Sequence, residues 1–269
     1  MKHFALPAPP NPEGMIRLYE KDYHYLVRVR RLKSGMCFDA ALPGGGETQI
    51  RILSTVDGIL IGECLGDSWK QAPSGQEPAS LPPIALFQGL PKGQKMDTIV
   101  RQAAEGALSL VLPFQSEYST ARLGKNPSQA FSGEKLRRWQ RIVREARQQS
   151  GSATDTEVRA PCSLEALLAY WDSIKAKYQR PAGILLHQEP LGKGSFHDYL
   201  SNCPDFVVLT VGPEGGFSPR EVSLFLDAGF KPFVMGNTIL RTETAAVYGA
   251  AAIKIILLEN QACRKNPAE

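Results

Sequence analysis

The sequence predicts an α/β protein with two domains, a small β-rich domain followed by an α/β domain whose sheet is largely parallel. Three observations support this fold class. Short apolar segments separated by turn residues precede Trp69, a proline-rich stretch follows, and strand-like and helix-like segments then alternate to the C-terminus. A chain of 269 residues is long enough for both, since a domain usually takes about 100–200 residues.

The N-terminal domain is expected over residues 1–72, with a linker over 73–83. Strands are predicted at 37–42, 49–53 and 59–64. Asp57-Gly58 has the composition of a tight hairpin turn between the last two strands. The stretch from Trp69 to Pro83 has four prolines, small polar residues and no periodic apolar pattern, which is typical of a linker.

The second domain is expected over 84–269. Strands are predicted at 84–89, 110–113, 182–187, 206–211 and 233–235. Helices are predicted over 94–108, 133–149, 218–228 and 243–259. Such alternation is typical of a parallel sheet covered by helices, and ligands bind beyond the carboxyl ends of the strands of such a sheet.

Composition and spacing argue against several classes of protein. There is no run of about 18 or more apolar residues, and prolines interrupt the N-terminus, so we expect neither secretion nor a membrane span and place the protein in the cytoplasm. The five cysteines are far apart and no two histidines stand at i, i+4, so we expect reduced thiols and no metal site. A net charge of +4 is too small to indicate nucleic-acid binding by itself.

A glycine-rich loop follows the most strand-like segment of the chain. Residues 206–211 (FVVLTV) run directly into 212–217 (GPEGGF), and Ser218 and Glu221 then form a capping box with Pro219 at the first helical position. This order of strand, loop and helix predicts a ligand site, because glycine lets backbone approach a ligand. The alternative is a plain turn, and the loop matches neither the dinucleotide nor the triphosphate motif.

A second loop repeats the arrangement. A short strand is followed by 236–241 (GNTILR), and Thr242 is a suitable N-cap for the long apolar helix that comes next. Glu243 either serves the helix dipole at this N-terminus or takes part in chemistry. Arg241, between the loop and the helix start, is well placed to bind an anion or a reacting base.

Together the two loops resemble a known signature. VGPEGGFSPREV at 211–222 and MGNTILRTETAAVYGAA at 235–251 are similar to the motifs of the small-subunit (16S) ribosomal RNA uracil-N3 methyltransferases, the RsmE family of the SPOUT superfamily. The similarity extends to 26–35, 91–105 and 136–151. It implies a PUA-like β-barrel that binds RNA, followed by a SPOUT α/β domain with a trefoil knot, a rare topology. It also implies S-adenosyl-L-methionine as methyl donor, ribosomal RNA or the small ribosomal subunit as substrate, and a homodimer.

The resemblance also assigns residues to the cofactor and to the reaction. The methyl donor is expected to lie against Thr210, Gly212, Pro213, Glu214, Gly215, Gly216, Met235, Gly236, Asn237, Ile239 and Leu240. Arg241 and Glu243 fall in the LRTETA motif, where the target base meets the methyl group across the dimer interface. Methylation of the imide nitrogen removes its proton and places negative charge on the flanking carbonyl oxygens. We therefore expect Arg241 to stabilise that charge, with Glu243 as base or as the group that orients Arg241.

Two basic clusters stand out from a nearly neutral remainder. The candidate RNA-binding residues are Arg28, Arg30, Arg31, Lys33, Arg137, Arg141 and Arg144. On the helix expected over 133–149, an apolar stripe of Leu136, Trp139, Val143 and Ala146 leaves the arginines on another face. Phosphate contact predicts an affinity that falls steeply with salt, and a merely solvated charged face is the alternative.

The chain departs from the family pattern at positions that face the substrate. Tyr118 and Ser152 stand where the family commonly has arginine, and Asn237-Thr238 stands in place of Pro-Arg. These changes leave open an enzyme that methylates another nucleotide, and an RNA-binding or ribosome-assembly protein without turnover. A small-molecule α/β enzyme is a third possibility, which would leave both basic clusters without a role.

Overall fold

The computed structural model describes residues 4–42, 46–66, 69, 81–120, 133–152 and 154–265. The chain divides into two compact units, Met1–Pro78 with Arg147–Asp155 and Ala79–Ala146 with Thr156–Glu269. The predicted boundary at residue 72 and the predicted linker over 73–83, except its last three residues, lie outside the described residues. The boundaries drawn from the sequence therefore stay a prediction.

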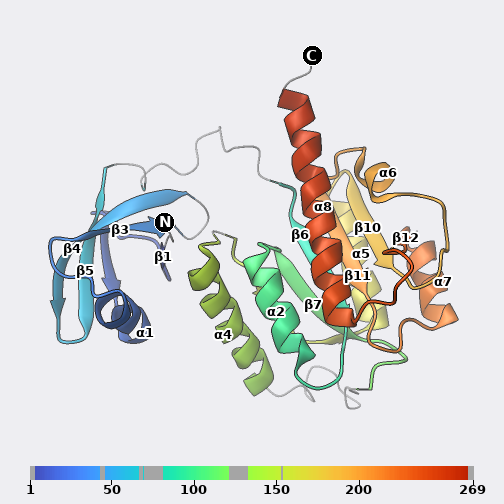
Figure 1. The fold of residues 1–269 in the computed structure, drawn as a ribbon, viewed down its shortest axis with the longest axis horizontal. Helices are drawn as coiled ribbons and strands as arrows, with labels where there is room; N and C mark the ends of the chain where they lie inside the picture. Colours follow the sequence, from blue (N-terminus) through green and yellow to red (C-terminus); the bar gives the residue numbers. More distant parts are fainter. Residues whose placement is uncertain are drawn as a thin grey trace. The chain divides into compact units, whose positions relative to one another are not determined.

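The first unit holds a five-stranded sheet in the order β1-β3-β4-β5-β2 (Figure 1). Its strands are β1 (Phe4–Ala5), β2 (Met15–Leu18), β3 (Cys37–Ala41), β4 (Glu47–Val56) and β5 (Ile59–Leu65). All neighbours are antiparallel except β1 and β3. Asp57 and Gly58, with φ of 53° and 74°, join β4 to β5, so the predicted hairpin is confirmed.

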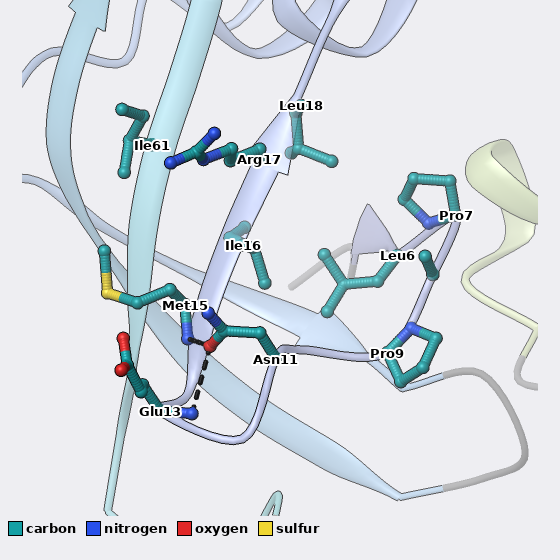
Figure 2. A pocket seen from close by; sticks show the side chains of 11 residues that line it. Leu6, Pro7, Pro9, Asn11, Glu13, Met15, Ile16, Arg17, Leu18 and Ile61 are labelled. Atoms are coloured by element: carbon teal, nitrogen blue, oxygen red, sulfur yellow. Dashed lines mark hydrogen bonds between the residues drawn. The ribbon is translucent and has the colours of Figure 1, made fainter.

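The edges of this sheet were not predicted. The edge strands β1 and β2 are too short, or too interrupted by charge, to show a periodic pattern. The same holds for two short helices that were not predicted, α1 (Glu20–Tyr23) and the π-helix η1 (His24–Val29). In the described part of the chain β1 and β2 do not pair with each other, so the sheet is open. Figure 2 shows residues that line a cavity of about 390 Å³ formed by the segment after β1, β2 and Ile61 of β5. Asn11, one of these residues, accepts through Oδ1 from the N–H groups of Glu13 and Met15.

The second unit holds a seven-stranded sheet in which every pairing is parallel, in the order β12-β10-β11-β6-β7-β8, with β9 also on β7. Its strands are β6 (Ile84–Gly89), β7 (Leu110–Gln115), β8 (Glu157–Val158), β9 (Cys162–Ser163), β10 (Pro181–Leu186), β11 (Phe206–Val211) and β12 (Lys231–Phe233). Every residue of β6 and β11 is buried, as expected for strands covered on both faces. The predicted α/β class with a largely parallel sheet is confirmed.

Helices cover both faces of this sheet (Figure 1). They are α2 (Lys95–Glu105), α4 (Gly133–Ser150), α5 (Leu164–Lys177), α6 (Phe196–Leu200), α7 (Pro219–Asp227) and α8 (Thr242–Lys265). One apolar cluster joins α2, α4, α6 and α8 to the sheet, and a second joins α5 and α7. No described helix is long and apolar enough to cross a membrane.

Some elements of this unit differ from the prediction. α5, α6, β8 and β9 were not predicted. In α5 the buried residues Leu164, Leu167, Trp171 and Ile174 do follow helical spacing, but apolar side chains also lie on its other faces and obscure the pattern. β12 ends at Phe233, where a strand over 233–235 was expected, because Val234 and Met235 leave the sheet to line a cavity.

Candidate functional site

The glycine loop at 212–217 is anchored by the start of α7. The predicted capping box is present: Ser218 Oγ accepts from the Glu221 N–H at 3.1 Å, and Glu221 Oε2 accepts from the Ser218 N–H at 2.9 Å. Glu221 is completely buried, and its carboxylate also accepts from Ser116 Oγ at 3.0 Å and from the Glu117 N–H at 2.9 Å. The loop is therefore fixed to the end of β7 as well as to its own helix.

Geometry requires two of the glycines in this loop. Gly216 has a φ of 70°, a left-handed conformation that side chains disfavour. A Cβ on Gly215 would lie 2.8 Å from the Cβ of Tyr118, too close for any other residue. Tyr118, which stands where the family pattern has arginine, thus packs against the back of the loop.

The second loop, at 234–241, is joined to the first by one hydroxyl. Thr242 is buried, and its Oγ1 donates to the Gly212 carbonyl at 2.6 Å and accepts from Gln88 Nε2 at 2.9 Å. The hydroxyl expected to cap α8 therefore links the ends of β6 and β11 to the first turn of α8.

A cavity of about 780 Å³ opens between the two loops, beyond the carboxyl ends of β10, β11 and β12. Every predicted cofactor residue except Thr210 and Gly215 lines it, and so does Arg241, whereas Glu243 does not. Thr210 is fully buried within β11, and its hydroxyl has no hydrogen-bond partner among the described residues. Known ligand pockets of proteins span roughly 300–1,000 Å³, so the cavity has the size of a small-molecule site.

The sequence interpretation missed a third wall of this cavity. Leu186, His187, Gln188 and Pro190, at and just after the end of β10, line it together with the two loops. A signal was present, because a buried parallel strand was predicted here and its carboxyl end must open at the same edge as the glycine loop.

A lysine that was not predicted connects two of the predicted residues. Lys95 Nζ, in the first turn of α2, lies 2.7 Å from Glu214 Oε1 and 3.5 Å from Glu243 Oε2. The N–H of Lys92 donates to both carboxylate oxygens of Glu214 at 3.2 Å. Glu214 and Glu243, from loops far apart in sequence, therefore share one counter-ion.

These contacts shift the pKa values of Lys95 and Glu214. The hydrogen bond to Glu214 raises the pKa of Lys95, although burial opposes this. Partial burial pushes the pKa of Glu214 upward, but the Lys95 hydrogen bond, together with the backbone N–H groups, lowers it overall. Both groups are therefore charged near neutral pH.

The predicted RNA-binding residues lie on the surfaces of the two units. Arg137, Arg141 and Arg144 are exposed on α4, opposite its buried residues Trp139, Ile142, Val143 and Ala146. Arg28, at the end of η1, and Arg30, Arg31 and Lys33 after it are exposed on the first unit. Among the residues that the structure describes, no group of His, Cys, Asp or Glu side chains is arranged to hold a metal ion.

Comparison with known proteins identifies the class to which these features belong. A family model described as the RNA methyltransferase domain matches residues 77–254. Ribosomal RNA small subunit methyltransferase E of Synechocystis sp. is 32% identical over 248 residues, which cover 91% of this chain and 74% of that protein. The protein of the same name from Bacillus subtilis is 26% identical, over 87% of each chain.

Solved structures share the fold. Ribosomal RNA small subunit methyltransferase E from Neisseria gonorrhoeae, bound to S-adenosyl methionine, superposes with a TM-score of 0.72 at 24% identity, over 95% of this chain and 98% of that one. A methyltransferase from Legionella pneumophila, in complex with the same cofactor, superposes with a TM-score of 0.74 at 23% identity. Both match across nearly the whole chain.

Proposed function

The chain belongs to the RNA methyltransferase family, and we propose that it transfers the methyl group of S-adenosylmethionine to N3 of a uridine in small-subunit (16S) ribosomal RNA. The relatives that the chain matches over most of its length are named as small-subunit ribosomal RNA methyltransferases, and the solved structure from Neisseria gonorrhoeae binds this donor. The observation that carries the proposal is the cavity, because both glycine loops of the family signature border it. The uridine target rests on the LRTETA motif at 240–245.

The walls of the cavity suit this donor. Gly212, Gly216 and Gly236 leave the backbone of both loops accessible, and a Cβ on Gly236 would meet no atom within 4 Å. Ile239, 83% exposed, and Leu240 offer apolar surface suited to a purine ring and a thioether chain. S-adenosylmethionine supplies a methyl group that its sulfonium activates for transfer to a nucleophile.

Arg241 and Glu243 are the proposed catalytic pair. Arg241 is exposed on the cavity wall, where its guanidinium is available to the carbonyl oxygens that gain charge as uracil loses its N3 proton. Glu243 lies in the first turn of α8, partly buried beside Lys95. We assign it the role of base, or of the group that holds Arg241 in place.

We propose that the basic residues of both units bind the phosphates of the substrate. The three arginines of α4 lie on the exposed face of an otherwise well-anchored helix, and the cluster over 28–33 lies on the first unit. Arg141 has a partner in Glu145 at 3.7 Å, a weak surface pair that a phosphate would compete with. We further propose that the first unit is the PUA-like RNA-binding domain, which its mainly antiparallel five-stranded sheet supports.

A homodimer with a trefoil knot in each α/β domain completes the proposal. Tyr248, Ile255 and Leu258 of α8 are each about half exposed at helical spacing, which leaves an apolar stripe for a second copy of the chain. A small apolar groove between α2 and α8 lies beside the stripe.

The cytoplasm is the proposed compartment, since the relatives act on ribosomal RNA and the four described cysteines are free thiols.

Calorimetric titration with S-adenosylmethionine is the first test. Ala245 lines the cavity, so Ala245→Trp is expected to fill it and to weaken binding at least about tenfold, a loss of about 1.4 kcal/mol. Leu226→Trp, on the exposed side of α7, is the matched control and is expected to bind normally.

The second test is methylation itself. Small subunits from cells that lack the gene, incubated with enzyme and donor, are expected to gain one methyl group on a uridine, detected by mass spectrometry.

Two results would redirect the assignment. Modification of a different nucleotide would support the second candidate function, which the departures at Tyr118, Ser152 and Asn237-Thr238 favour. A native chain that binds RNA but not the donor would point to an RNA-binding protein without turnover.

A further inference from the structure

Lys95 occupies a position that its own helix does not explain. It is the first residue of α2, where the positive end of the helix dipole disfavours a cation. Gln94 before it makes no side-chain cap, and Asp97 is the acidic residue of the first turn. The position of the ammonium is instead explained by the two carboxylates that it contacts.

Those carboxylates depend on Lys95 for their charge balance. The side chains of Glu214 and Glu243 are 26% and 20% exposed, and Glu243 Oε2 is buried without a hydrogen-bond partner in the residues that the structure describes, so its contact with Lys95 at 3.5 Å is an ion pair only. Within the described part of the chain, Lys95 is the cation that pairs with either of them. Two carboxylates that lose a shared cation repel each other, so loss of Lys95 would push the side chains of Glu214 and Glu243 apart.

The contacts also join two parts of the site that are distant in sequence. Glu214 belongs to the first glycine loop and lines the cavity, while Glu243 belongs to the helix that follows the second loop. The backbone N–H of Lys92, in the same β6–α2 connection, donates to both carboxylate oxygens of Glu214. A Cβ on Gly89, at the end of β6, would lie 2.6 Å from Pro213 Cδ, so this connection and the first loop pack without a gap.

We infer that Lys95 is a positioning residue that couples the donor-binding loop to the reacting end of α8, by holding Glu214 and Glu243 with one ammonium. The inference rests on the proposed function, which identifies S-adenosylmethionine as the donor and Glu243 as the candidate base. Lys95 does not touch the reacting atoms. It holds Glu214 at the cavity wall and Glu243 in the first turn of α8, so donor affinity and turnover both depend on it.

The test compares Lys95→Met, which keeps the apolar stem and removes the charge, with Lys95→Arg, which keeps the charge. We expect Lys95→Met to weaken S-adenosylmethionine binding about tenfold and to lower single-turnover methylation on the order of 10²-fold, with the KM for RNA little changed. Lys95→Arg is expected to recover most of both. Arg101→Met, on the exposed side of α2, is the matched control for loss of a cation.

A double-mutant cycle separates positioning from simple stabilisation. Lys95→Met combined with Glu243→Gln is expected to cost little more than the worse single change, because the two act as one unit. The acidic limb of the kcat/KM profile is also expected to move to higher pH in Lys95→Met, since Glu214 loses the hydrogen bond that lowers its pKa.

Two outcomes would overturn the inference. One is a Lys95→Met variant that melts earlier but keeps native donor affinity, turnover and pH profile, which would make Lys95 a structural clamp only. The other is strict additivity in the cycle. A native chain that binds the donor but leaves uridine unmodified would defeat the proposed function alone, since the coupling would still be measured as the loss of donor affinity in Lys95→Met.

Discussion

The two loops that border the cavity are held in different ways. The first, at 212–217, ends in a capping box whose buried glutamate, Glu221, accepts from the Ser218 N–H and from two groups outside its helix, Ser116 Oγ and the Glu117 N–H. The second, at 234–241, has Asn237, Thr238 and Ile239 exposed to solvent, and in the described structure residues 234–240 make no hydrogen bond. One wall of the site is rigid before any ligand arrives, and the other is free to adapt.

This contrast assigns different tasks to the two walls. A preformed wall binds without loss of conformational freedom and sets where the donor lies. A wall with few internal contacts opens at little cost in free energy and closes over what has bound. Changes in the first loop should therefore reduce stability, and changes in the second should reduce function and leave stability nearly intact.

The largest expected effect is on turnover, in the second loop. Arg241→Ala is expected to lower single-turnover methylation by about 10²–10³-fold, because a charge-stabilising group is lost. The thermal unfolding midpoint should stay close to the native value, since Arg241 is exposed. Unchanged turnover in this variant would contradict the assigned role.

A smaller effect, on stability, is expected at Glu221 of α7, which anchors the first loop. Glu221→Ala should lower the free energy of unfolding by about 3 kcal/mol, because the N–H groups of Ser218 and Glu117 and the hydroxyl of Ser116 lose a buried acceptor. Asn237→Ala, its counterpart in the second loop, should change stability by less than about 0.5 kcal/mol. Urea unfolding measures both, and equal losses would contradict the contrast between the walls.

The smallest effect compares two glycines that share a left-handed conformation. Gly216 and Gly236 have φ of 70° and 84°. Gly216→Ala should cost about 1 kcal/mol of unfolding free energy, because its loop cannot relax. Gly236→Ala should cost less than half as much, since the second loop can shift to relieve the strain. A larger cost at Gly236 in the same unfolding experiment would show that the second loop is the stiffer one.

Local signals predicted much of this site. The capping box of Ser218 and Glu221 lies within four residues, and the strand over 206–211 is a continuous apolar run, so neighbours in sequence determine both. The family motifs then assigned the cavity residues. The edge strand β2 was missed because it is only four residues long and carries a charge, and helix α5 was missed because apolar residues on its other faces obscure its helical spacing.

Interactions across long stretches of sequence were beyond prediction. Lys95 contacts Glu214 and Glu243 because β6 and β11 pair in the sheet. No sequence pattern around residue 95 predicts these contacts. The same holds for Tyr118, which the sequence marked as a lost arginine and the structure places against Gly215. His187 was within reach of prediction, since it ends a strand that was itself predicted.

The pairing of β6 with β11 also governs when the protein can fold during synthesis. Residues 84–88 cannot complete their place in the sheet until residues 207–211 have left the ribosome, and the second glycine loop and α8 follow later still. Contacts of such long range slow folding and keep apolar strands uncovered until their partners have been made. The nascent chain therefore acquires its cavity only once α8 has been synthesised, and any truncation before α8 yields an incomplete core rather than a smaller working enzyme.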